Sequence, residues 1–244
     1  MLRLLSQYME IQLLDIVGGD MSPEEVEKLA TKTKALEDAK IYIEDTSFSI
    51  DDIITQVDYL VQARGVKLVL IDYLQMIKVN SRRENSREAD VARVCRELKG
   101  LARKYKIAIV VNSQLSRAVE TRGGDKKPQL SDLRESGAIE QDADKVLFLH
   151  RPEYYNITED ENGNSTNGVA DIIIAKNRDG AIDSVKLNYV ARCTKFKDLA
   201  DTLENRKHYG SEYFLEIRKD EFKGHVTEVI KGLKHNDIIE DHPF

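Results

Sequence analysis

Apolar residues in the first part of the chain predict helices and one short strand. Leucines recur at helical spacing through residues 2–17, so a first helix is expected there. The Ser-Pro-Glu-Glu sequence at 22–25 predicts the start of a second helix, because it offers a cap, a proline for the first helical position and acids for the first turn. Ile-Tyr-Ile at 41–43 predicts a short strand, and the spacing at 50–63 predicts another helix that the next glycine closes.

Three continuous apolar runs predict strands of a different kind. Residues 67–72, 107–112 and 145–149 are almost uninterrupted apolar sequences. Such runs are typical of strands that are buried on both faces of a parallel sheet. Clean helical spacing over 87–105 separates the first two runs. The alternation of strand and helix predicts an α/β fold with a largely parallel sheet flanked by helices.

The last third of the chain predicts a β-hairpin and then an extension. Residues 170–175 and 184–190 form a hairpin-like pair that we expect to close the core. Beyond it the sequence is charged and has weaker periodicity. We therefore divide the chain into one domain at 1–199 and a C-terminal extension of unknown role at 200–244.

Composition is that of a globular protein. Of 244 residues, 41% are hydrophobic and 33% are charged, and no apolar run approaches the roughly 20 residues that span a bilayer. No signal peptide is recognisable at the start, so a cytoplasmic location is expected. Cys95 and Cys193 provide neither a disulfide framework nor a metal-binding spacing, and both are expected to be packing thiols.

The net charge of −6 argues against nucleic-acid contact over the whole surface. It is compatible with one local basic loop, and the long polar stretch 117–134 is a candidate for it. This stretch carries five cations and a Gly-Gly pair, with no aromatic residue for base stacking. A loop of this kind can follow a phosphate backbone. The alternative interpretation is an ordinary solvated loop.

Polar side chains follow the first two predicted strands, where ligands of parallel sheets usually bind. Asp72 ends one strand, and Asn-Ser-Gln at 112–114 ends the next, so these residues should converge on one site. A carboxylate at Asp72 can hold a water-coordinated Mg²⁺ beside a nucleotide, although it could also merely cap a loop. The amide of Gln114 can contact a phosphate and a moving loop together, or it is simply a polar loop start.

Two cations stand together at the end of a later strand. Lys176 and Arg178 are two residues apart, and residues with this spacing on a strand point the same way. Together they could grip a phosphate chain, and an arginine inserted from a neighbouring subunit acts as an arginine finger. The alternative is a pair of solvated hairpin charges.

Five segments occur in an order and at spacings that resemble a known family. They are Leu-Ile-Asp-Tyr-Leu-Gln at 70–75, Ser-Gln-Leu-Ser-Arg at 113–117, Asp-Leu-Arg-Glu-Ser-Gly at 132–137, Ile-Glu-Gln-Asp-Ala-Asp at 139–144 and Ile-Ala-Lys-Asn-Arg-Asp-Gly at 174–180. As a set they resemble the C-terminal RecA-like domain of the DnaB-type replicative DNA helicases, over about residues 2–199. The resemblance implies a RecA-like fold of the P-loop NTPase type. It also implies an ATP-hydrolysing homo-hexamer that uses Mg²⁺, moves along single-stranded DNA at the replication fork and works with a primase and a helicase loader.

The resemblance also implies roles for individual residues. Asp72 matches the Walker B acid that supports Mg²⁺, and Gln114 matches the polar sensor at the γ-phosphate. Lys176 and Arg178 match the basic pair that reaches into the ATP site of the adjacent subunit. Three residues match the loop that holds single-stranded DNA inside the ring: Arg134, Glu135 and Gly137.

One departure from the family pattern is clear. The family's phosphate-binding loop has the form G-x-x-x-x-G-K-[ST], and this sequence contains no Gly-Lys pair. We therefore expect the chain to begin inside the motor domain, without the Walker A loop, the catalytic glutamate and the N-terminal primase-binding domain, and to be inactive alone. Two other hypotheses stay open: a non-catalytic remnant or interaction module, and a recombination ATPase of the RecA or RadA kind, which the segment at 132–137 disfavours.

Overall fold

The computed structural model describes residues 2–80, 86–133 and 137–199. These residues form two compact units. The first unit holds 2–43, 149–172 and 184–199. The second holds the described residues of 44–148 and 173–183. None of the helices in these ranges is long and apolar enough to cross a membrane.

The first unit begins with two short helices, α1 (Leu2–Met9) and α2 (Leu13–Gly18). The single helix predicted over 2–17 is therefore wrong: Glu10 has φ 59°, outside the helical range. The break lets Met9 and Ile11 both be buried, at 0% and 2% exposure, although they would lie on different sides of a continuous helix. Ser6 Oγ fixes the bend by donating to Ile11 O at 2.6 Å.

The third helix, α3 (Pro23–Glu37), starts as predicted. Ser22 Oγ accepts from Glu25 N at 3.2 Å, and Ser22 N donates to Glu25 Oε2 at 2.9 Å, which is a complete capping box. The strand predicted at 41–43 is absent: these residues belong to neither sheet within the described ranges. Ile41 and Ile43 are 51% and 62% exposed, so these apolar residues have no core to enter.

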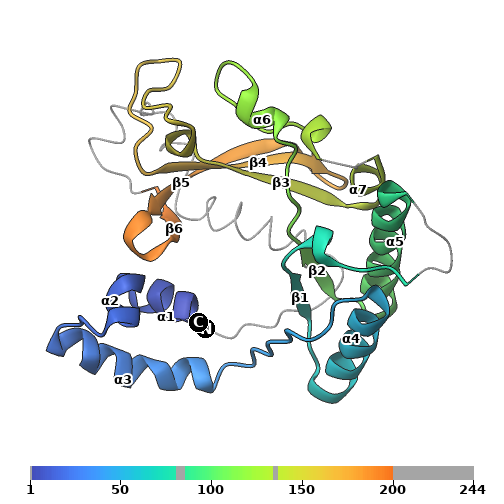
Figure 1. The fold of residues 1–244 in the computed structure, drawn as a ribbon, viewed down its shortest axis with the longest axis horizontal. Helices are drawn as coiled ribbons and strands as arrows, with labels where there is room; N and C mark the ends of the chain where they lie inside the picture. The colour runs from blue at the N-terminus through green and yellow to red at the C-terminus, as the bar shows by residue number, and fades with distance from the viewer. Residues whose placement is uncertain (1, 81–85, 134–136, 200–244) are drawn as a thin grey trace. The chain divides into compact units, whose positions relative to one another are not determined.

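The second unit is built on a pair of parallel strands, β1 (Leu68–Ile71) and β2 (Ala108–Val111). Leu68 pairs with Ala108 and Ile71 with Val111. Helices α4 (Ile50–Arg64) and α5 (Arg87–Tyr105) lie beside this pair (Figure 1). Both helices and both strands lie within a residue or two of where the sequence predicted them.

One face of α5 supplies much of the core of this unit. Val91, Val94 and Leu98 are no more than 5% exposed and pack with Ile50, at the start of α4, and with Leu74, in the short helix η1 (Leu74–Met76). Leu101 joins a second cluster with Val57 and Ile107. The apolar stripe that predicted the helix is therefore the stripe that it buries.

The prediction that these strands are buried on both faces is wrong for β1 and β2, and also for the third run, in which Leu147 and Leu149 are 46% and 49% exposed. Leu68 and Leu70 are 50% and 70% exposed, and Val110 is 39% exposed. The helices α4 and α5 cover one face, while the third apolar run, β3 (Lys145–His150), pairs in a different sheet. The continuous apolar sequence therefore leaves Leu68, Leu70 and Val110 without cover in the described structure.

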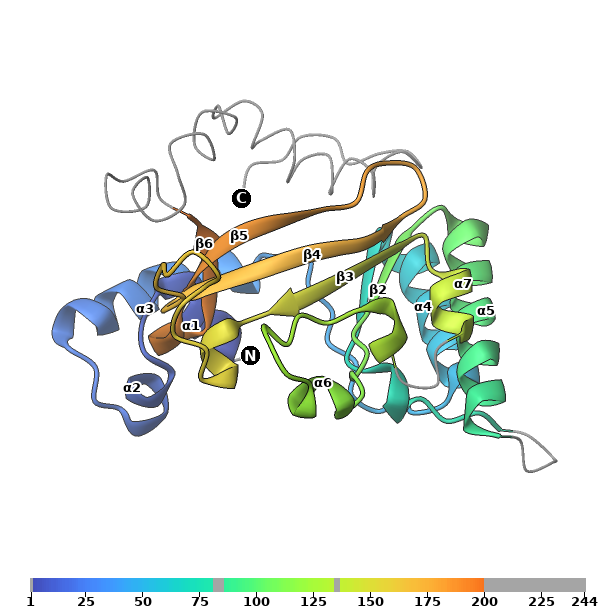
Figure 2. The ribbon, with the colours of Figure 1, turned by 90° about the horizontal axis from the view of Figure 1, so that it is seen from above.

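The other sheet has the strand order β3-β4-β5-β6, with β4 (Val169–Asn177), β5 (Asp183–Val190) and β6 (Lys195–Asp198) following in sequence (Figure 2). The predicted hairpin is β4 and β5, and β6 pairs antiparallel to β5. The division between the two units passes through β3, β4 and β5. Short 3-10 helices, η3 (Pro152–Tyr155) and η4 (Ala191–Cys193), complete the first unit.

The stretch predicted as one long loop at 117–134 contains regular structure. Helix α6 (Ala118–Thr121) and the 3-10 helix η2 (Leu130–Asp132) lie within it, and α7 (Gly137–Asp142) follows. Buried Val119 and Leu133, at 1% and 5% exposure, anchor the stretch, so it is not simply solvated. The extension at 200–244 lies outside the described residues.

Both cysteines are free thiols that pack as expected. Cys95 contacts the core formed by α4, η1 and α5, and Cys193 is fully buried. Burial, with a smaller contribution from Asp142, raises the pKa of the Cys95 thiol to about 11. Cys95 is therefore a packing residue and not a reactive nucleophile.

Shortening the core side chain Leu98 should destabilise the second unit. We expect Leu98→Ala to cost about 2–5 kcal/mol of unfolding free energy, because Leu98 is 5% exposed and its removal leaves a cavity. The control Leu70→Ala makes the same chemical change at a 70% exposed position and should cost no more than about 0.5 kcal/mol. Urea denaturation followed by circular dichroism measures both, and equal midpoints would contradict the core described here.

Candidate nucleotide-binding site

The carboxyl ends of β1 and β2 bring two of the predicted segments together. Asn112 N donates to Ile71 O at 2.9 Å, which continues the parallel ladder by one residue. Beyond it, Asn112 Nδ2 donates to Asp72 Oδ1 at 3.1 Å. Asp72 and Asn112 are both exposed. The expected convergence of the two strand ends is therefore present in the structure.

Gln75 joins these strand ends and was not singled out from the sequence. Its Nε2 donates to Ser113 Oγ at 3.0 Å, and its Oε1 accepts from Gln114 N at 3.1 Å. Its backbone carbonyl accepts from Arg87 Nη2 at 2.6 Å. A glutamine suits this place because one side chain carries both donor and acceptor. The signal that could have identified it is its position three residues after Asp72.

This arrangement leaves polar groups available at the strand ends. Asp72 Oδ2 and the side-chain amide of Gln114 make no hydrogen bond with any residue in the described ranges. No group of three His, Cys, Asp or Glu residues among the described residues could enclose a metal. A single carboxylate suits Mg²⁺, which binds one or two protein carboxylates together with phosphates and water. The residues present therefore fit an Mg²⁺ that arrives with a nucleotide.

Lys176 contacts the end of α7, and Arg178 contacts Asp144, two residues beyond it. Lys176 Nζ donates to the carbonyl of Glu140 and, at 3.4 Å, to that of Gln141. Arg178 Nη1 donates to Asp144 Oδ1 at 3.0 Å, and Arg178 N donates to Asp144 O at 2.9 Å. The last carbonyls of a helix have no partner within it, and a cation is favourable there. The structure thus holds Lys176 and Arg178 as one group around the α7 terminus.

Asp144 is shared between two cations. Lys99 of α5 donates to its Oδ2, and Arg178 contacts its Oδ1. Burial would raise the pKa of Asp144, but the hydrogen bond from Lys99 and the charges of Lys99 and Arg178 outweigh it, and the pKa is lowered. Asp144 therefore stays ionised and keeps Arg178 in place.

The predicted DNA loop is only partly within the described residues. Arg134 and Glu135 lie outside them, and Gly137 is the first residue of α7. The start of the loop is well fixed: Ser116 N donates to Asp132 O at 2.8 Å, and Leu133 forms a β-bridge with Leu115. The segment after β2 and the segment before the predicted DNA loop are therefore joined directly.

Asp132 itself is 3% exposed. It accepts hydrogen bonds from Arg122 and, at 2.8 Å, from Gln129 N. Burial acts to raise the pKa of Asp132, but these two hydrogen bonds lower it overall. Arg122, interpreted from the sequence as a loop cation for DNA, is thus engaged in an ion pair with a buried acid.

Comparison with known proteins identifies the family. The model of the DnaB-like helicase C-terminal domain matches residues 1–198. This chain belongs to that family. The replicative DNA helicase DnaB of Geobacillus stearothermophilus is 41% identical to it over 199 residues, covering 81% of this chain and 42% of that protein. Replicative DNA helicase DnaC of Bacillus subtilis is 40% identical over 199 residues, with the same coverage.

Solved structures agree with this family. A DnaB-like replicative helicase, described with its interactions with primase, has a TM-score of 0.73 and 34% identity and covers 82% of this chain and 47% of that chain. A second solved structure, described as an ATPase domain, has a TM-score of 0.72 and 33% identity and covers 81% of this chain and 69% of that chain. The predicted α/β fold of the RecA-like class is confirmed. This chain spans less than half the length of the curated relatives that it matches.

Neutralising Asp144 should weaken the second unit in a pH-dependent way. A carboxyl with a lowered pKa stabilises the fold above its ordinary pKa of 3.8, and that contribution is lost as the pH falls through the lowered value. At pH 7 we expect Asp144→Asn to lower the unfolding free energy by on the order of 1 kcal/mol, because its side chain is partly exposed. The deficit should shrink from pH 5 to pH 3 in urea titrations.

The control for this measurement is Asp179→Asn, which removes an exposed acid from the turn next to Arg178. It should leave the urea midpoint unchanged at every pH. An Asp144→Asn deficit that is the same at pH 7 and pH 3 would disprove the assigned electrostatic role.

Proposed function

We propose that these residues are the greater part of the motor of a hexameric replicative DNA helicase, which unwinds duplex DNA at the replication fork by hydrolysing ATP. The observation that carries the proposal is the junction of Asp72, Gln75 and Gln114 at the ends of two parallel strands. It supports a nucleotide site because parallel sheets bind ligands beyond these strand ends. Membership of the DnaB-like helicase family supports the same function.

Asp72 and Gln114 would act on the phosphate side of the nucleotide. Bound Mg²⁺ would neutralise charge on the β- and γ-phosphates, and Asp72 would hold it through water. Asn112 fixes one carboxylate oxygen of Asp72, so the other stays in a defined position. Gln114 would hydrogen-bond the γ-phosphate, and Gln75 holds its backbone.

Lys176 and Arg178 would enter the ATP site of the adjacent copy in a ring of six. Both are already held at the α7 terminus by carbonyls and by Asp144. This support favours catalysis because preorganised cations need little rearrangement when charge develops on the transferring phosphate. Arg178 would then be the arginine finger and Lys176 its neighbour on the phosphate chain.

Arg134, Glu135 and Gly137 would hold the backbone of single-stranded DNA. The bond from Ser116 to Asp132 supports this, since it connects the Gln114 segment to the start of that loop. We further propose a primase and a helicase loader as partners and a cytoplasmic location; one relative of known structure was described together with primase.

The sequence contains no Gly-Lys pair, so the amides and lysine that would cradle the phosphates must come from outside these 244 residues. We expect the isolated chain to hydrolyse no ATP. The proposal is therefore tested on a fusion that places the upstream motor segment of a relative before residue 1. That fusion should show ATPase activity stimulated by single-stranded DNA.

Arg178→Ala in the fusion should reduce the DNA-stimulated ATPase rate by about 10³-fold or more, the range found for arginine fingers, and leave nucleotide binding intact. The matched control is Lys104→Ala, since Lys104 pairs with Asp58 at 3.2 Å, away from α7. Normal turnover in Arg178→Ala, measured by phosphate release, would defeat the assignment.

A non-catalytic remnant or interaction module is the second candidate. The exposed apolar residues Leu68, Leu70 and Val110 favour it, because an uncovered sheet face invites association with another protein. Phosphate release by the fusion separates the candidates, because a non-catalytic remnant would hydrolyse no ATP. The recombination ATPase is not favoured, because the matched relatives are replicative helicases. Strand-separation and strand-exchange assays on the fusion distinguish those two.

A further inference from the structure

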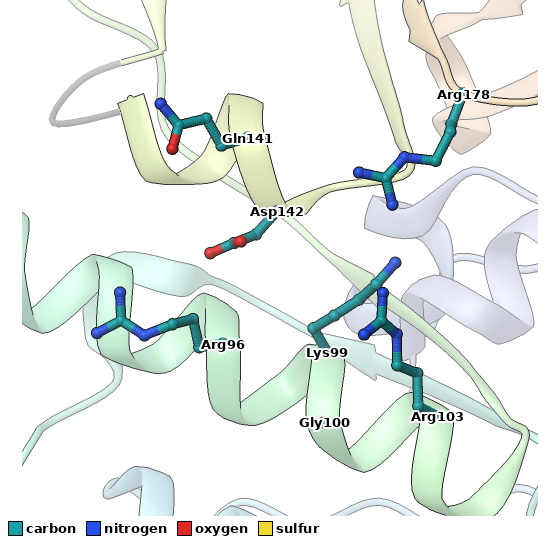
Figure 3. Close-up of a pocket in the computed structure, with 7 residues that line it drawn as sticks. All are labelled: Arg96, Lys99, Gly100, Arg103, Gln141, Asp142 and Arg178. Carbon is teal, nitrogen blue, oxygen red and sulfur yellow. The ribbon is translucent and has the colours of Figure 1, made fainter.

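A basic pocket lies between α5 and the α7 terminus in the second unit (Figure 3). Its volume is about 230 Å³, and its lining comprises Arg96, Lys99, Gly100, Arg103, Gln141, Asp142 and Arg178. Figure 3 shows Lys99 and Arg103 extending from α5 toward Arg178 on the opposite wall. Of the four cations, only Arg178 belongs to a segment that resembles the helicase family.

The pocket carries more positive than negative charge. Four cations line it, against the carboxylate of Asp142 and, just outside the lining, that of Asp144, which leaves a net charge of +2. The side chain of Asp144 is occupied by Lys99 and Arg178. Within the described ranges, Arg96 and Arg103 form no ion pair or hydrogen bond. Arg103 is attracted to Asp144 and helps to lower its pKa, but in this part of the chain its guanidinium and that of Arg96 have no hydrogen-bond partner and can meet an outside anion.

The three cations of α5 lie close together, and Asp142 and Asp144 offset only part of their charge. Arg96, Lys99 and Arg103 follow each other at intervals of three and four residues, so they lie on one face of the helix. Like charges at this spacing repel and destabilise a helix. An anion bound among them would relieve that repulsion.

Gly100 forms part of the lining and leaves open space there. Glycine in the middle of a helix is less stable there than alanine. A Cβ built at Gly100 would meet no atom within 4 Å, so neighbouring side chains do not require the glycine. Its absent side chain keeps the helix backbone accessible from the pocket.

We propose that this pocket binds a phosphoryl anion of di- or triphosphate size. Guanidinium groups match the oxygens of phosphate in a two-pronged geometry, and the pocket is smaller than the roughly 300–1,000 Å³ of sites that enclose a whole organic ligand. The inference deepens the proposed function and rests on it in one respect: Arg178 is also the proposed finger. Arg96, Lys99 and Arg103 would extend the contact of that finger along a phosphate chain.

Isothermal titration of the 244-residue chain with sodium tripolyphosphate, at low salt and without Mg²⁺, tests the pocket. We expect saturable one-to-one binding that weakens about tenfold in Arg96→Gln and in Arg103→Gln, since each loses a charge-assisted hydrogen bond. Lys104→Gln, on the same helix but paired with Asp58, is the control and should bind as the parent chain does. Equal binding in all four proteins would overturn the proposal.

Two further variants separate pocket binding from general attraction. Gly100→Met fills the pocket without changing charge and should abolish binding, whereas Gly100→Ala should bind within about threefold of the parent because a Cβ fits there. Asp142→Asn removes the competing carboxylate and should tighten binding about threefold or more. The proposal would also be overturned if Gly100→Met still binds tripolyphosphate while unfolding at the same temperature as the parent chain, which shows that the variant is folded.

The source of the anion is resolved by competing ligands. If the pocket recognises only the phosphate chain, the Kd for ATP without Mg²⁺ should lie within about threefold of the Kd for tripolyphosphate. A much lower Kd for ATP would indicate that the base of the nucleotide is recognised as well. Both results support the pocket. Binding of a single-stranded oligonucleotide, but not of tripolyphosphate, would overturn it.

These measurements do not depend on hydrolysis or on a second subunit. Failure of the arginine variants to weaken binding therefore leaves the proposed helicase function intact. Conversely, normal turnover in Arg178→Ala would contradict the assignment of Arg178 as the arginine finger and leave the proposal of the anion pocket unaffected.

Discussion

The parallel pairing of β1 with β2 is the constraint on which the candidate site depends. The register that places Ile71 opposite Val111 makes the next residues, Asp72 and Asn112, direct neighbours. A shift of one residue would turn each side chain to the other face of the strand pair. The apolar residues of α4 and α5 pack on one face only and thereby fix the register. Core packing therefore determines the position of the polar groups at the strand ends.

A second group is organised by charge instead of by apolar packing. Without a partner, the side chains of Lys176 and Arg178 would repel each other and sample many conformations in solvent. The carbonyl ends of α7 and the carboxylate of Asp144 provide opposite partial and full charges at short range. Asp144 also binds Lys99, so β4 and α5 are connected through one acid. The position of the proposed finger consequently depends on α5, far from it in sequence.

The sequence predicted those features that local spacing determines. The limits of α5, the cap at Ser22 and the convergence of Asp72 with 112–114 follow from periodicity, side-chain capping and parallel topology. The break at Glu10 does not follow from apolar spacing: besides the local bond from Ser6 to Ile11, Glu10 contacts Lys195 and Lys197 of β6, far along the chain. Those two lysines lower the pKa of Glu10 to about 2, and no local pattern shows that partnership.

The role of Gln75 shows why a motif is more informative than its charged residues. Sequence reasoning selects the acid because a carboxylate suggests metal chemistry, but Gln75 is the side chain that joins β1 to the Gln114 segment. From there the chain runs through Ser116, which holds the carbonyl of Asp132, to the start of the predicted DNA loop. A change in the contacts of Gln114 with a phosphate would thus act on a path of hydrogen bonds joined by a short stretch of backbone, and not on an isolated loop. In the proposed function, the physical link between nucleotide and DNA would lie in neutral amides and backbone groups.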